Sequence, residues 1–146
     1  MTNNKEGRKL LTVLMPLYGL MVASLVCAQT LDDQQTVPLG VWGGEHIRLT
    51  VLKNGATVEY DCAFGSINEP LLHDEKGIFE ARGVYSFEMG GPSRPGSPQP
   101  RQHKALYRGC VKGDRMILTT TLPETDRHIG DFSLRKDAAA ELEKCM

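Results

Sequence analysis

The residues best suited to chemistry fall on two neighbouring segments, at positions 46–52 and 57–62. His46 and Arg48 lie on the first segment, and Glu59 and Asp61 lie on the second. Apolar and polar residues alternate along both segments, which is typical of half-buried β-strands. The four polar side chains are therefore expected on one face of a hairpin, with apolar side chains on the other.

The turn between these segments decides which side chains oppose each other. Asn54-Gly55 is the strongest short hairpin signal, because both residues tolerate positive φ. With these two residues as the turn, Arg48 opposes Asp61 and His46 lies diagonal to Asp61. Opposed charges of this kind contribute about 0.2–1 kcal/mol on an exposed sheet.

This polar face has three interpretations. In the first, the side chains solvate the sheet and form ordinary ion pairs. In the second, they form a recognition patch together with the nearby Trp42. In the third, His46 acts with Asp61 or Glu59 as the acid–base pair of a hydrolase, although no Ser or Cys nucleophile stands at a recognisable spacing. We therefore predict no catalytic residue, and the candidate binding residues are Trp42, His46, Arg48, Glu59 and Asp61.

Other chemistries lack the residues that they need. The histidines lie on separate segments and no C-x-x-C or H-x-x-x-H spacing occurs, so we predict no metal site and no cofactor. Without residues 1–28, which contain Lys5, Arg8, Lys9 and Glu6, the chain has 14 basic and 17 acidic residues, a net charge of −3. This balance argues against nucleic-acid binding. Residues 90–112 contain five Lys or Arg and no acid, which permits weak contact with an anionic surface.

The cysteines are assigned from the face on which each one falls. Cys27 is expected to leave with an export signal, so Cys62, Cys110 and Cys145 remain. Cys62 falls on the apolar face of the first hairpin, whereas Cys110, just before a predicted Lys112-Gly113 turn, points away from the core. These two thiols cannot reach each other, given the close approach that a disulfide requires. We therefore predict a Cys62–Cys145 disulfide and a free thiol at Cys110.

The first 28 residues have the pattern of an export signal. Residues 1–9 are polar and positively charged, residues 10–26 are apolar, and small residues precede a cleavage site after Ala28. An uncleaved membrane anchor and a lipoprotein signal are alternatives, although Val26 is not the small residue that a lipoprotein signal needs. A cleaved signal predicts a periplasmic or secreted protein with no membrane span.

The remainder is expected to form a single domain. Residues 29–38 are polar and are expected to be a flexible lead-in, and residues 39–146 are expected to be one β domain. Residues 90–102 contain four prolines and three glycines, which predicts an exposed loop. Asp137 is positioned to cap a short helix over residues 138–144.

The strand pattern predicts an all-β fold. Six to eight short antiparallel strands joined by hairpins leave two exposed edges unless the sheet closes on itself. We therefore predict a small up-and-down barrel, with a two-sheet sandwich as the alternative. High glycine and proline content agrees with a fold of short strands and turns rather than long helices.

Two resemblances accompany this pattern. Gly40-Val41-Trp42, at the entrance to the first strand, is similar to the G-x-W motif of calycins, the lipocalin- and avidin-like barrels. In that group a basic residue on the last strand packs across the tryptophan, and Arg135 is the residue placed to do so. The strings WGGEHIRL, VEYDCAFGSI, GDFSL and KC also resemble a family of uncharacterised secreted bacterial proteins. That resemblance implies export but no activity.

Together, these patterns predict a secreted or periplasmic binding module. Its expected partner is a small molecule, a lipid or a protein, with inhibition of an enzyme as one form of protein binding. A hydrolase using His46 with Asp61 or Glu59 and a structural envelope protein are the alternatives. A barrel interior filled with side chains would favour binding of a protein by the outer face.

Overall fold

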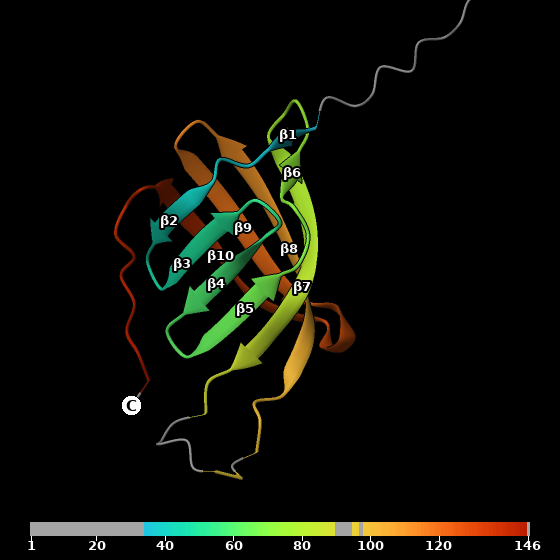
Figure 1. Ribbon diagram of the computed structural model, residues 1–146, viewed down its shortest axis with the longest axis vertical. Helices are drawn as coiled ribbons and strands as arrows, with labels where there is room; N and C mark the ends of the chain where they lie inside the picture. Colours follow the sequence, from blue (N-terminus) through green and yellow to red (C-terminus); the bar gives the residue numbers. More distant parts are fainter. Residues whose placement is uncertain (1–33, 90–94, 97, 146) are drawn as a thin grey trace, which may run out of the picture.

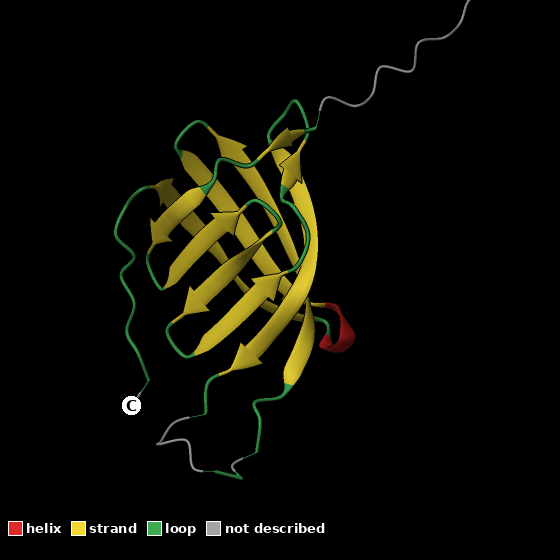
Figure 2. Ribbon diagram, in the orientation of Figure 1, coloured by secondary structure: helices red, strands yellow, loops and turns green. Residues whose placement is uncertain are grey.

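The structure is a computed structural model that describes residues 34–89, 95–96 and 98–145. The expected signal at 1–28 and the first part of the lead-in lie outside the described residues. Strands make up most of the described chain, and the one helical turn within it is η1 (Figures 1 and 2). The elements are β1 (Gln35–Thr36), β2 (Gly40–Gly44), β3 (Ile47–Leu52), β4 (Gly55–Tyr60), β5 (Ala63–Ile67), β6 (Leu72–His73), β7 (Ile78–Phe87), β8 (Gln102–Lys112), β9 (Arg115–Leu122), η1 (Pro123–Thr125) and β10 (Arg127–Lys136).

Eight of the strands form a closed antiparallel barrel, in the order β10-β2-β3-β4-β5-β7-β8-β9. The predicted barrel is therefore confirmed, and closure excludes the two-sheet sandwich. β1 and β6 pair as a small separate sheet beside one end of the barrel, which we call the β6 end (Figure 1). The β2–β3 turn, the β4–β5 turn and the β7–β8 connection lie at the opposite end, which we call the loop end.

The interior of the barrel is filled by side chains. Inward-facing residues alternate along each strand, and an eight-stranded barrel is just wide enough for such side chains to fill it. Each of the largest is less than 2% exposed: Trp42, Ile47, Leu49, Tyr107, Met116, Leu118 and Leu134. Full burial of one aliphatic side chain of this kind contributes about 1.5–3 kcal/mol. The fold is therefore held by a packed core that occupies the barrel axis.

Both predicted hairpins occur, but their turns lie one residue away from the expected positions. The first turn is Lys53-Asn54, and Gly55 pairs with Leu52 at the start of β4. A Cβ at Gly55 would collide with the carbonyl oxygen of Ile67 on β5, so this glycine is needed inside the sheet. In the second hairpin Lys112 pairs directly with Arg115. Moving a turn by one residue displaces the pairing by two, which changes the partners but keeps the predicted faces.

Two further expectations are wrong in part. The lead-in is ordered from Gln35 onward, because β1 pairs with β6 and Val37 is fully buried. Residues 138–144 do not form a helix; they continue from β10 as an extended tail that runs along the outside of β2 toward the loop end (Figure 1). We call residues 138–145 the C-terminal strap.

Candidate functional site

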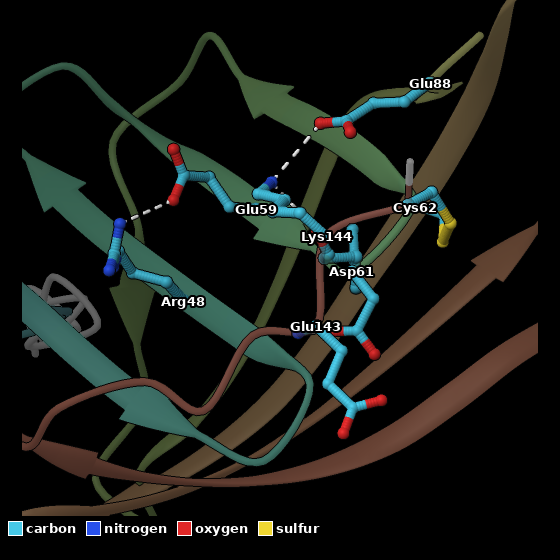
Figure 3. Close-up of polar contacts among 9 residues, drawn as sticks. Arg48, Glu59, Asp61, Cys62, Glu88, Glu143 and Lys144 are labelled. Carbon is cyan, nitrogen blue, oxygen red and sulfur yellow. Dashed lines mark hydrogen bonds and ion pairs between the residues drawn. A yellow bond between two sulfur atoms is a disulfide. The ribbon is translucent and has the colours of Figure 1, made fainter. Parts of the chain in front are cut away.

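Four of the five predicted site residues lie together near the loop end of β3 and β4. Arg48 and Glu59 are register partners on these strands, and the Arg48 Nη1 atom donates to Glu59 Oε2 at 2.7 Å (Figure 3). Each of these two side chains is 43% exposed. The expected opposition of Arg48 and Asp61 is wrong because of the displaced register. The pair is an exposed ion pair, which contributes about 0.2–1 kcal/mol.

His46 forms the second charged pair of this face. It occupies the β2–β3 turn with a φ of 64°, in the left-handed region that non-glycine residues seldom adopt. Its main-chain N–H donates to the Glu141 carbonyl at 2.8 Å, and its Nδ1 atom lies 2.6 Å from Asp61 Oδ2. The hydrogen bond and the negative charge of Asp61 raise the pKa of His46, and Glu45 adds to this effect. The pairing therefore stabilises the protonated imidazole relative to that of a free histidine.

The C-terminal strap is held over the same face by main-chain and side-chain contacts. The Glu143 N–H donates to Asp61 Oδ1 at 2.8 Å, and the Glu141 N–H donates to the Gly44 carbonyl at 3.0 Å. Lys144 Nζ donates to the Tyr60 carbonyl at 3.2 Å. It also lies 3.3 Å from Glu88 Oε1, and Figure 3 marks this pair with a dashed line. The strap thus links β2, β4 and the end of β7.

A covalent bond completes this attachment. Cys62 and Cys145 form the predicted disulfide, with 5.3 Å between their Cα atoms, and Cys110 is the free cysteine among residues 34–89 and 98–145. The predicted disulfide implied that the end of the chain lies near Cys62. The sequence did not indicate that Asp61 accepts a hydrogen bond from the Glu143 N–H. A main-chain donor carries no residue-type signal, so only the predicted disulfide pointed to this contact.

The side chains of this face attach the strap to the barrel. Each carboxylate oxygen of Asp61 has a partner, His46 on one side and the Glu143 N–H on the other. The His46 Nε2 atom lies 3.4 Å from Glu45 Oε1, so both ring nitrogens have carboxylate neighbours. Arg48 and Glu59 satisfy each other. The polar groups are thus occupied in fixing the strap and the sheet.

Trp42 does not belong to this outer face. Its side chain is fully buried in the barrel, and its Nε1 atom donates to the Pro38 carbonyl at 3.0 Å. The expected packing of Arg135 across Trp42 is also wrong. Lys136 is the register partner of Trp42, whereas Arg135 is an exposed residue 3.6 Å from Asp114.

The remaining predicted features are distributed around the barrel. Within the described ranges, no three His, Cys, Asp or Glu side chains gather in a way that could hold a metal ion. In the basic segment, Lys104 pairs with Glu124 at 3.1 Å and Arg108 pairs with Glu80 at 2.7 Å, so part of its charge is neutralised. Residues 90–94 of that segment lie outside the described residues.

Fold and site together define a class of protein: a small closed antiparallel β-barrel with a filled interior and a disulfide-linked C-terminal strap. Comparison of the chain with protein-family models, curated proteins and solved structures finds no match. No helix in the described part of the chain is long and apolar enough to cross a bilayer.

Proposed function

We propose that this protein is an extracytoplasmic binding module that engages a protein partner with the outer wall of its barrel. The observation that carries the proposal is the filled interior. Trp42, Tyr107 and Leu118 occupy the barrel axis and are each fully buried. A ligand-holding barrel needs an open interior of useful volume, so the filled axis favours recognition at the surface.

The disulfide and the N-terminal pattern support the extracytoplasmic location. A Cys62–Cys145 bond persists in an oxidising compartment and is rare in the cytosol of ordinary bacteria and eukaryotes. The expected export signal at 1–28 would deliver the chain to such a compartment. The two arguments are independent, because the disulfide links described residues and the expected signal does not contribute to it.

The geometry does not favour the hydrolase alternative. A histidine base needs one ring nitrogen directed at a nucleophile while the other is oriented by an acid. In His46 both ring nitrogens have carboxylate neighbours, Asp61 and Glu45. The nearby sulfur of Cys62 is consumed by the disulfide. The arrangement explains attachment of the strap without any reaction.

Native mass spectrometry of the protein purified from the envelope of its own host tests this proposal. We expect a complex with a second polypeptide in a fixed ratio, which dissociates when charges on the outer wall are reversed and persists when Tyr107 is replaced by Phe. A retained molecule of a few hundred daltons, insensitive to surface substitutions, would contradict the proposal and indicate an interior site. A monomer without any partner would favour a structural envelope protein.

A further inference from the structure

The outer wall over β7, β8 and β9 carries an exposed apolar row. Ile78, Cys110 and Ile117 are register partners on these three neighbouring strands. Ile78 is 52% exposed and Ile117 is 51% exposed, which places both among the most exposed large apolar side chains in the described residues. The free Cys110 lies between them, with its Sγ atom 3.9 Å from the Lys76 carbonyl.

A row of positive charges borders the apolar row on the side of the β6 end. Arg115 is the register partner of both Lys112 and Arg135, so three cations lie side by side across β8, β9 and β10. Like charges that are directly opposed on a sheet destabilise it. Among the described residues Lys112 and Arg115 form no ion pair, and Arg135 has only Asp114 at 3.6 Å, each 65% exposed.

On the side of the loop end, the isoleucines are bordered by a row whose polar side chains pair with one another. Glu80 pairs with Arg108 at 2.7 Å, and Thr119 donates to Asp131 at 2.6 Å. Its charges are satisfied within the chain, whereas in the basic row only Arg135 has an acidic neighbour among the described residues. Of the two charged rows that border the isoleucines, the basic row is therefore the less compensated.

The surface along these two rows is hollowed. Three open grooves of about 480, 280 and 810 Å³ follow one another from the strap to β6. The first and second share Arg115 and Ile117, and the second and third share Cys110 and Lys112. Glu45 and Glu141 line the first groove and Glu75 lines the third, whereas the second has the cations Lys112 and Arg115 and no acid. We call this combined surface, with its apolar and basic rows, the basic belt.

We propose that the basic belt docks an extended acidic segment of the partner protein, with apolar side chains on the isoleucine row and carboxylates on the basic row. This inference rests on the proposed function, since it assigns the surface and the chemistry of that partner. Four neighbouring strands at about 4.8 Å spacing span about 14 Å, which an extended segment of four to five residues covers. Carboxylates placed there would relieve the repulsion among Lys112, Arg115 and Arg135.

The charge pattern favours a narrow segment over an anionic bilayer. A flat membrane against this wall would also meet the neighbouring row, which contains the carboxylates of Glu80 and Asp131. An extended chain running across the strands contacts the isoleucines and the cations and leaves those acids in water. A lipid surface is therefore an outcome for the experiment to exclude.

Binding of a labelled peptide of alternating Glu and Leu, six residues long, tests the proposal. We expect saturable binding in low salt that weakens as salt rises, and no binding of the matched Lys-Leu peptide. Arg115→Glu with Arg135→Glu should weaken binding by at least about tenfold, since two attractions become repulsions. Lys53→Glu with Arg101→Glu, which makes the same change in net charge elsewhere, should leave the affinity within about twofold.

Cys110 supplies a second measurement at the same surface. Bound peptide should slow alkylation of Cys110 in proportion to the fraction of protein occupied, because the thiol lies under the docked segment. Absence of peptide binding, an equal loss in the control variant, or unchanged alkylation at saturation would overturn the proposal. So would stronger capture of phosphatidylglycerol vesicles that depends on Arg115 and Arg135. If the native complex persists while the peptide fails, the binding module stands and only the basic belt is refuted.

Discussion

Loss of the Cys62–Cys145 disulfide should be the most destabilising of the conservative changes available at the strap. The two cysteines are 83 residues apart in the sequence, so the bond closes most of the barrel into one loop. For a loop of this size the chain-entropy relation gives about 4.5 kcal/mol, and measured values more often fall at about 2–4 kcal/mol. We expect Cys62→Ala with Cys145→Ala to lower the free energy of unfolding by about 3–4 kcal/mol, which corresponds to a fall in Tm of roughly 12–16 °C for a domain of this size.

The assay is urea unfolding followed by the fluorescence of Trp42, which is the single tryptophan of the chain and is fully buried. The wild-type protein under reducing conditions should match the double variant, and the m-value should rise because the unlinked unfolded chain exposes more surface. Cys110→Ala, the matched control, should change stability by less than about 0.5 kcal/mol because it is a surface substitution. A loss of less than about 1 kcal/mol in the double variant would refute the reasoning and show that the strap contacts alone hold the chain end.

Three other outcomes are expected. Intact-mass measurement of the exported protein should show loss of residues 1–28, and a full-length, membrane-retained chain would instead support the anchor alternative. Asp61 raises the pKa of His46 above its ordinary value of 6.5. The stabilisation from this pair should therefore be fully present below pH 6.5 and lost as the pH rises through the raised pKa. NMR titration of the His46 ring should show the raised pKa, and Asp61→Asn should abolish the shift. Gly43→Ala places a Cβ against the backbone of Ala138 and Ala139, so hydrogen exchange in the strap should accelerate, and unchanged exchange would show that the strap does not pack on β2.

The fold was predictable because the signals for it are periodic. Alternation along the first hairpin put Leu49 and Val58 on the buried face whether the turn began at residue 53 or 54, since the two registers have the same parity. The disulfide followed from the same parity. The cross-strand partners in the first hairpin could not be predicted in the same way. They depend on the close approach of the Ile67 carbonyl on β5 to Gly55 on β4, and the sequence of the hairpin does not reveal that contact.

The candidate site was predictable in membership but not in role. Sequence reasoning gathered His46, Arg48, Glu59 and Asp61 on one face, yet it could not show that the strap would occupy Asp61. The helical propensity of residues 138–144 pointed the other way, and tertiary contacts overrode it. Extended backbone lets Glu141 and Glu143 donate to β2 and Asp61 and brings Cys145 to Cys62. The burial of Trp42 inside the barrel was not predicted either, because a motif of three residues does not specify whether its side chains are buried.

The position of the disulfide also divides the barrel mechanically. The covalent ring encloses everything from Cys62 to Cys145, and of the strands that the structure describes only β1 to β4 lie outside it. A force that pulls on the two ends of the chain can therefore peel away these four strands and must then stop. From Gln35 to Cys62 the released chain extends by about 95 Å at most, while the six remaining strands stay within one closed loop. A protein tethered through its N-terminal region would thus have a limit to its extension under force, and the disulfide sets that limit.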